Sequence, residues 1–180
     1  MRPLLRPLLR RPAVLTGVVL VAVAVAIALL VFEPWKLLID QRVAEALPAP
    51  SVAVPAAPAA PTGPVVIARG ELIAHEHDSS GQVVVLRLAD GSRVLRLEDL
   101  NTSNGPSLRV WLADQPVLPG RAGWFVFDDG RYVDLGELKG NIGSSNYAVP
   151  ADVDLAALGS VSIWCERFSV SFAAARLEPG

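Results

Sequence analysis

A run of 20 uncharged residues, from Ala13 to Phe32, is the strongest constraint on how this chain can fold. At about 1.5 Å rise per residue, a helix of that length spans the roughly 30 Å hydrocarbon core of a bilayer. The run therefore predicts one transmembrane helix over residues 13–32. A cleaved signal peptide is the alternative, but its apolar region is usually only about 7–15 residues long, and no small-x-small cleavage site follows Phe32.

Arginine is concentrated ahead of the apolar run. Four arginines lie in the basic N-terminus, residues 1–12, whereas only Lys36 and Arg42 follow the run closely. By the positive-inside rule, we expect residues 1–12 in the cytoplasm and the bulk of the chain outside, as a single-pass protein of the cell membrane. Arginine outnumbers lysine 14 to 2, which is typical of GC-rich bacterial genomes and favours a bacterial source.

Two segments connect the apolar run to the rest of the chain. Glu33 and Pro34 are typical of a helix start, and apolar residues then recur at three- and four-residue spacing. This pattern predicts an amphipathic helix over residues 33–47, which either lies on the outer membrane surface or continues the span. Residues 48–64 contain six prolines, which favour polyproline geometry. They predict a spacer that reaches at most about 50 Å at roughly 3.1 Å per residue.

Residues 65–180 predict an all-β domain. Short apolar or alternating segments, separated by Gly, Pro and Asp, are typical of strands, and Asp90-Gly91 marks a hairpin turn. The expected strands cover 65–75, 82–88, 92–97, 108–112, 124–127, 132–135, 161–165 and 168–177. We therefore expect a sandwich or a small barrel of about 7–9 short strands. Residues 152–158 are the only helical segment expected here, about two turns with an acidic start.

The charge of this domain limits its partners. Residues 65–180 carry 10 Lys and Arg against 15 Asp and Glu. An acidic surface repels the phosphate backbone, so we expect no nucleic-acid partner. No Ser-His-acid or paired-carboxylate arrangement is present, so there is no hydrolase or transferase signature, and any enzymatic activity would be a redox activity.

Four motifs in the domain stand out together. They are Leu95-Arg-Leu-Glu-Asp-Leu-Asn-Thr-Ser-Asn-Gly-Pro106, Leu135-Gly-Glu-Leu-Lys-Gly-Asn-Ile-Gly143, Asn146-Tyr147 and Ile163-Trp-Cys-Glu-Arg-Phe-Ser-Val-Ser-Phe172. In this order they resemble the DM-thirteen (DM13) domain family of electron-transfer domains. The resemblance implies a β-rich extracellular module in which Cys165 does redox work, as a bare thiol or as a ligand to a prosthetic group. Animal members accompany a DOMON domain, so this chain's partner would be a separate redox or surface protein.

Cys165 is the candidate catalytic residue. It is the only cysteine, so no intramolecular disulfide forms. Apolar alternation changes face near Glu166-Arg167, which predicts a bulge or a tight turn there. Three interpretations of the thiol remain open: a buried core residue, a redox thiol or ligand, and an intermolecular disulfide. On the same face of a strand, Arg167 would lower the pKa of the thiol.

His75 and His77 are candidate cofactor ligands together with Cys165. Two imidazoles and a thiolate suit copper or haem iron, although the sequence names neither the prosthetic group nor the metal. His77-Asp-Ser-Ser-Gly81 also matches an early His-x-(Thr/Ser)-x-Gly pattern of the family that the motifs resemble. The alternative is a solvated hairpin end. No Cys-x-x-Cys-His motif is present, which excludes covalent c-type haem.

The segment 138–147 is a candidate binding loop, with Lys139, Asn141, Asn146 and Tyr147 as its contacts. Its glycines permit positive φ, and its asparagines can bond their own backbone. The alternative is a rigid connection whose polar side chains bond neighbouring backbone. Two functions follow from the whole sequence: a membrane-anchored electron-transfer module using Cys165, or a non-enzymatic binding or adhesion module in which Cys165 is structural.

Overall fold

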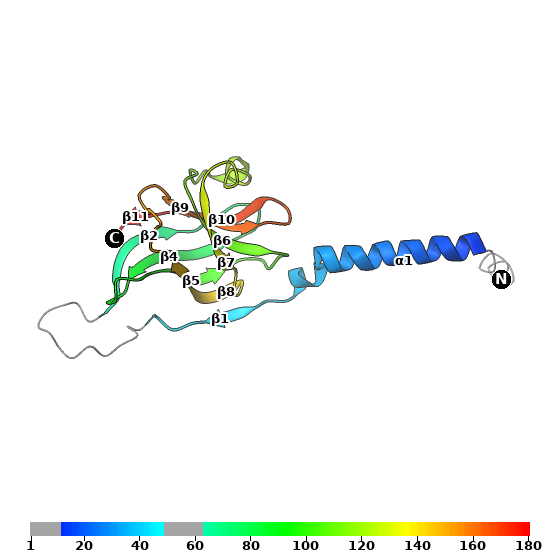
Figure 1. Ribbon diagram of the computed structural model, residues 1–180, viewed down its shortest axis with the longest axis horizontal. Helices are drawn as coiled ribbons and strands as arrows, with labels where there is room; N and C mark the ends of the chain where they lie inside the picture. The colour runs from blue at the N-terminus through cyan, green and yellow to red at the C-terminus, as the bar shows by residue number, and fades with distance from the viewer. Residues whose placement is uncertain (1–11, 49–62) are drawn as a thin grey trace, which may run out of the picture. The chain divides into compact units, whose positions relative to one another are not determined.

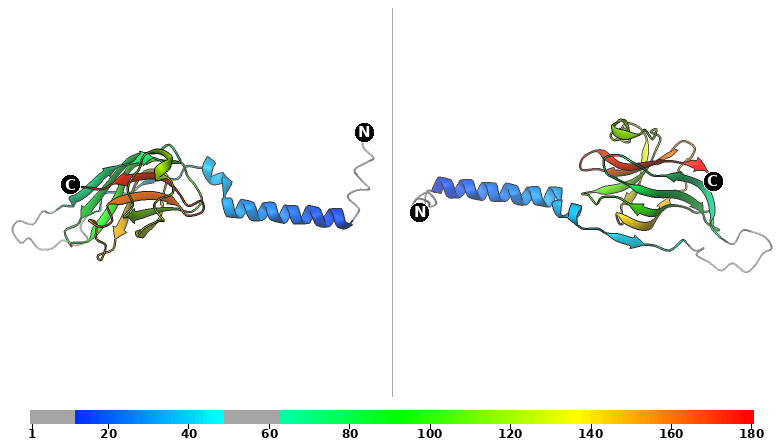
Figure 2. Two further views of the ribbon diagram at one scale, coloured as in Figure 1. Left: turned by 90° about the horizontal axis from the view of Figure 1, so that it is seen from above. Right: turned by 180° about the vertical axis from the view of Figure 1, so that it is seen from behind.

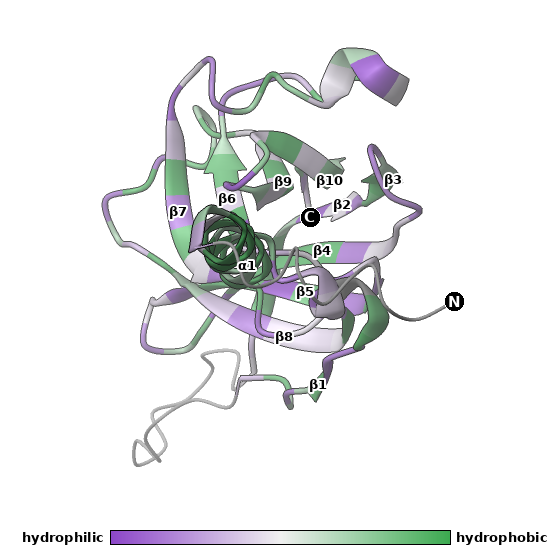
Figure 3. Cartoon of the chain, turned by 90° about the vertical axis from the view of Figure 1, so that its right-hand side faces the viewer, coloured by the Kyte–Doolittle hydropathy of each residue, from purple (hydrophilic) through white to green (hydrophobic). Residues whose placement is uncertain are grey.

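The computed structural model describes residues 12–48 and 63–180, and the chain divides into two compact units, Met1–Trp35 and Lys36–Gly180. The first unit contains the helix α1 (Pro12–Phe32), none of whose residues is buried. Figure 3 shows α1 nearly end-on, with mainly hydrophobic turns. The helix is long and apolar enough to cross a membrane, a property that a signal sequence near the N-terminus shares.

The second unit is built from two β-sheets (Figures 1 and 2). In spatial order, the first sheet contains β1 (Arg42–Ala44), β8 (Ile142–Val149), β5 (Arg93–Asn101), β4 (Ser80–Arg87), β2 (Val65–Glu71) and β11 (Glu178–Pro179). The second contains β3 (Ile73–Ala74), β10 (Val170–Arg176), β9 (Ser160–Cys165), β6 (Leu108–Ala113) and β7 (Tyr132–Glu137). Both sheets are open, so the all-β prediction is confirmed as a sandwich and not as a barrel.

The core lies between the sheets, and alternation along the strands explains it. In β6, Leu108, Val110 and Leu112 face the other sheet and join the main core, while Trp111 and Ala113 point to the opposite face. That outer face is also covered, because the connection between β6 and β7 packs Phe127 and its neighbours over it. The central strands of the second sheet are therefore buried on both faces, and every residue of β9 is buried.

Two predicted elements of the domain are absent. Residues 124–127 form turns and not a strand, because Phe127 is fully buried as part of the cover over the second sheet. Residues 152–158 form turns and not a helix. Their acidic start caps a single turn, in which Ala157 and Leu158 donate backbone hydrogen bonds to the Asp154 carbonyl. Both segments are short, so packing outweighs their local preference.

The helix predicted over residues 33–47 is also wrong. A short 3-10 helix, η1 (Pro34–Leu38), is followed by an extended segment whose residues Arg42–Ala44 form β1. This strand pairs in parallel with β8 at the edge of the first sheet. Cross-strand hydrogen bonds compete with the helical pattern there, because they bind backbone groups that a helix would pair internally. Most of the proline-rich segment 48–64 lies outside the described residues.

Candidate functional site

Cys165 is the last residue of β9 and lies between two other strands. It pairs with Val170 of β10 on one side and with Leu108 of β6 on the other. Its side chain is 0% exposed, and Sγ donates a hydrogen bond to the Pro106 carbonyl, with 3.1 Å between the two heavy atoms. The interior of the sandwich therefore surrounds this thiol.

A four-residue turn, Glu166–Ser169, joins β9 to β10 beside Cys165. Ser169 has φ +47, in the left-handed region that non-glycine residues rarely adopt. This turn reverses the chain, so β10 begins with a new inward and outward alternation. The turn predicted from the change of face near Glu166-Arg167 is thereby confirmed.

The environment of Cys165 holds the thiol in its protonated form. Burial is the largest effect and raises the pKa of the thiol, because the apolar interior disfavours a thiolate. The backbone N–H groups of Phe168 and Arg167 lower that pKa, as does the charge of Arg167, while the Glu76 carboxylate raises it. Arg167 acts in the direction predicted from the sequence, but burial outweighs it. In this conformation the thiol is a poor nucleophile.

His75 is buried, and both of its ring nitrogens have partners. Nδ1 lies 2.9 Å from the Ser171 hydroxyl, and Nε2 lies 3.0 Å from the Leu118 carbonyl. A carbonyl can only accept, so Nε2 carries the hydrogen. Burial lowers the pKa of His75, and the Leu118 carbonyl opposes it less strongly. His75 therefore acts as a neutral connector between β3 and the loop that covers the second sheet.

His77 points elsewhere. Its Nε2 lies 2.5 Å from the Glu76 carboxylate, and its ring packs on Phe172 with 4.0 Å between centroids. The expected shared face with His75 is not formed, because β3 ends at Ala74 and the chain turns immediately afterwards. Within residues 12–48 and 63–180, no group of three or more His, Cys, Asp or Glu side chains could hold a metal. Cys165, His75 and His77 therefore do not form such a three-residue group.

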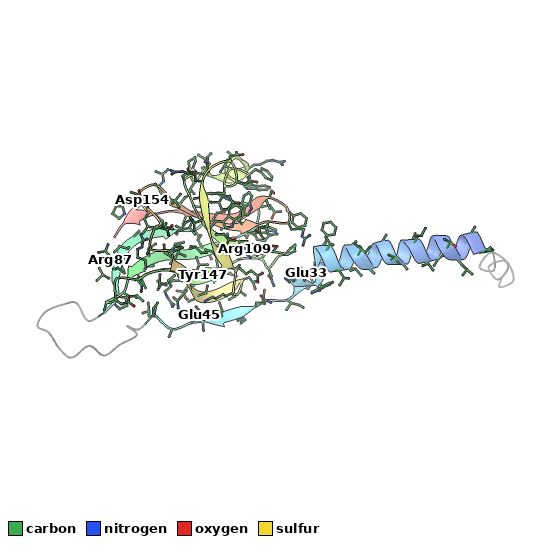
Figure 4. The ribbon with its side chains drawn as sticks, viewed as in Figure 1. Glu33, Glu45, Arg87, Arg109, Tyr147 and Asp154 are labelled. Atoms are coloured by element: carbon green, nitrogen blue, oxygen red, sulfur yellow. The ribbon has the colours of Figure 1, made fainter. Side chains whose placement is uncertain are left out.

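Lys139 and Tyr147 lie at the edge of the first sheet, where the sequence predicted a binding loop (Figure 4 labels Tyr147 and Glu45). Lys139 Nζ donates to the Glu45 carboxylate at 2.8 Å and to the Asn146 carbonyl at 2.7 Å. Tyr147 is buried, and its hydroxyl accepts a hydrogen bond from the Lys139 backbone N–H at 3.1 Å. Much of the predicted loop is the strand β8.

Asn141 and Asn146 hold the segment that contains β1. Asn141 is 1% exposed; its Oδ1 accepts from the Gln41 N–H at 2.7 Å, and its Nδ2 donates to the Thr102 carbonyl at 2.8 Å. Asn146 donates from its backbone N–H to the Glu45 carboxylate at 2.7 Å. The polar side chains of the predicted loop thus bind backbone and side chains of this same chain.

Two further residues of this edge were not selected from the sequence. Arg96 donates to the Glu45 carbonyl at 3.0 Å, and Asn104 donates to the Ile39 carbonyl at 3.0 Å. Both side chains are at most 9% exposed, although both are polar. They belong to the motif over residues 95–106, but no sequence signal linked them to residues 39–46.

An aromatic stack crosses the outer face of the second sheet. The half-exposed Tyr132 stacks on Trp111 with 3.8 Å between ring centroids, and Trp111 stacks on Trp164 at 5.1 Å. Trp164 is the neighbour of Cys165 in sequence but lies on the opposite face of β9. The stack therefore connects the surface with the strand that carries the thiol.

A surface hollow of about 550 Å³ lies away from Cys165. It is lined mainly by charged and polar side chains of β2, β4, β10 and β11, including Arg69, Glu71, Arg176 and Glu178. The lining contains two arginines and two glutamates, so it shows no preference for a ligand of one sign.

Comparison with known protein families identifies one family that includes these residues. A family model described as electron transfer DM13 matches residues 71–177, more than half of the chain. The chain belongs to the DM13 family. The match confirms the resemblance found in the four motifs and includes Cys165, His75 and His77, whereas β1 lies outside it. No curated protein and no solved structure matches the chain.

Proposed function

We propose that this DM13 protein is a membrane-anchored electron-transfer module, with its β-sandwich outside the cell membrane and Cys165 as its redox group. The observation that carries the proposal is the match to the electron-transfer family, which covers the only thiol of the chain. The apolar α1 and the arginines ahead of it support the anchoring and the orientation. The partner is a second redox protein that contains a disulfide.

The chemistry requires the thiol to leave its buried, protonated state. Opening of the turn Glu166–Ser169 exposes the sulfur to water, where it loses its proton to solvent. The N–H groups of Arg167 and Phe168 favour the thiolate. The Cys165 sulfur then attacks the partner's disulfide: a bond between the two proteins forms, the partner's S–S bond breaks, and its second sulfur leaves as a thiolate.

A test is to incubate the full chain, in detergent micelles, with oxidised glutathione and to detect the mixed disulfide by mass spectrometry. We expect an adduct on the wild type and none on Cys165→Ser. Because the serine hydroxyl can still donate to the Pro106 carbonyl, the substitution should change the free energy of unfolding by less than about 1.5 kcal/mol. A folded wild type that forms no adduct over days, while its unfolded form reacts, would refute the redox role.

The alternative is a binding or adhesion module in which Cys165 is structural. The complete burial of the thiol and its raised pKa favour this second candidate. Under it, Cys165→Ala should lower the free energy of unfolding, by roughly 1–3 kcal/mol for a lost buried group, without changing any exchange reaction of the native protein. The two candidates therefore differ in whether the native protein exchanges disulfides.

A further inference from the structure

The segment of residues 39–46, here called the docking segment, lies in extended form along the edge of β8 that is not paired with β5. Its strand β1 pairs in parallel with β8, with Val43 opposite Gly143. Backbone hydrogen bonds run in both directions: Ile142 N–H donates to the Gln41 carbonyl at 3.3 Å, and Glu45 N–H donates to the Ser144 carbonyl at 2.9 Å. This is the pattern by which a sheet edge takes up an added peptide strand.

Side chains hold the first end of the docking segment. The buried Asn141 bonds the Gln41 N–H through its oxygen, and its Nδ2 lies 3.0 Å from the Asp40 carboxylate. Asn104 donates to the Ile39 carbonyl. Side-chain amides of the β-sandwich thus bind both the backbone of residues 39 and 41 and the Asp40 carboxylate.

Cationic side chains hold the second end. Lys139 pairs with the Glu45 carboxylate at 2.8 Å, and this hydrogen bond is the main cause of the lowered pKa of Glu45. The Asn146 N–H binds the same carboxylate, while Arg96 donates to the Glu45 carbonyl. Only 9% of the Arg96 side chain is exposed, so this cation is built into the sheet.

Gly140 and Gly143 allow the backbone in the middle of the docking segment to approach the β8 edge closely. A Cβ at Gly140 would lie 2.6 Å from the Gln41 carbonyl oxygen, and a Cβ at Gly143 would collide with the Val43 carbonyl oxygen. Gly143 also has φ +109, which side chains rarely permit. The edge is therefore shaped for an extended backbone with one carboxylate at each end.

The β8 edge and the docking segment come from different parts of the chain. The residues of the edge lie inside the DM13 match, whereas the docking segment precedes it. We propose that the β8 edge is a peptide-docking site for an extended segment with two carboxylates five residues apart, and that the chain's own docking segment occupies it as a releasable ligand.

Docking determines the length of the membrane tether, a consequence that rests on the anchoring in the proposed function. With the segment docked, six residues separate Phe32 from Ile39, a reach of at most about 25 Å at 3.3–3.6 Å per residue. With the segment released, all 32 residues between Phe32 and Val65 form the tether, a reach of about 110 Å.

Trypsin cleavage after Arg42 tests the docking in the full chain, in detergent micelles. A paired strand resists proteolysis, although the Arg42 side chain is exposed. We expect Asn141→Ala to accelerate this cleavage roughly tenfold, the effect of losing hydrogen bonds to a buried amide. The matched control is Glu137→Gln, whose side chain is 84% exposed and lies in β7, and it should leave the rate unchanged. Equal rates in all three proteins would contradict the docking.

A peptide tests the recognition. A labelled peptide with the sequence of residues 38–47 should bind the full-length Val43→Pro variant, because proline removes a backbone donor from the docking segment. It should bind the wild type at least tenfold more weakly, because the tethered segment has a high effective concentration. A peptide with asparagine and glutamine in place of the two acids should bind neither protein. Failure of the acidic peptide to bind a Val43→Pro variant that keeps the wild-type circular dichroism spectrum would overturn the site, and equal binding to wild type would overturn its occupancy.

The tether has its own readout. A protease site is inserted into the stretch 49–62 of both the wild type and Val43→Pro, and each protein is cut in membrane vesicles. After cutting, the domain should stay in the membrane pellet in the wild type and be released into the supernatant in Val43→Pro. Release from both proteins would refute the short tether, while sedimentation of neither protein before cutting would refute the anchoring. None of these measurements depends on Cys165, and Cys165→Ser should behave as the wild type.

Discussion

At the scale of single residues, the surroundings of Cys165, His75 and His77 determine their chemistry more than the residue type does. The sequence predicted a strand and a change of direction around Cys165, because both depend on local alternation. The depth of the thiol could not be predicted, since it depends on β6 and β10, which pair on either side of it. His75 and His77 show the same limit: they are two residues apart in sequence but have separate partners, because β3 ends at Ala74 and neither histidine lies in a strand.

His75 leads to a prediction about pH. Its pKa is lowered in the folded state, so the unfolded chain binds a proton first as the pH falls. Stability is therefore full above the ordinary histidine pKa of about 6.5, and it decreases below that value until the folded-state pKa is reached. Chemical unfolding between pH 8 and pH 5 should show this loss in the wild type and in His77→Gln. The same loss in His75→Gln would assign it to other groups.

At the scale of secondary structure, the hairpins were predictable and the edge was not. The Asp90-Gly91 turn forms as expected: Gly91 has φ +84, and the Asp90 carboxylate accepts from the Ser92 N–H at 2.9 Å. The strand β8 was predicted as a loop because glycine, serine and asparagine disfavour strands. It forms because β5 pairs along its length and the docking segment covers its other edge. Pairing that is distant in sequence leaves no local signal.

Gly143 provides the corresponding test. Gly143→Ala meets two costs, a positive φ and a collision with the Val43 carbonyl, so we expect a loss of about 1–3 kcal/mol in the free energy of unfolding. It should also accelerate tryptic cleavage after Arg42. Gly136→Ala is the matched control, since Gly136 has φ +122 but no atom near its added Cβ. Identical cleavage rates in the two variants would mean that β1 does not approach β8 so closely.

At the scale of the whole molecule, the sequence predicted an apolar helix followed by an all-β domain, and the structure has both. It did not predict that the folded unit begins at Lys36, ahead of the proline-rich stretch. Composition indicates whether a segment is apolar, polar or proline-rich, but it does not indicate which segment it pairs with. The partner of β1 lies about 100 residues further along the chain. The family match supports a role in electron transfer, and because the thiol is buried, the redox role that we propose for Cys165 requires the domain to open locally.

The rate of disulfide exchange at Cys165, compared with the rate of global unfolding, tests this account most directly. Both rates are measured on the full chain in micelles at increasing denaturant, the exchange with a small aromatic disulfide and the unfolding by tryptophan fluorescence. If the turn Glu166–Ser169 opens locally, exchange at zero denaturant should be at least tenfold faster than global unfolding and nearly independent of low denaturant concentrations. Exchange that equals the global unfolding rate throughout would contradict the electron-transfer role of Cys165 and leave the thiol as a structural part of the core.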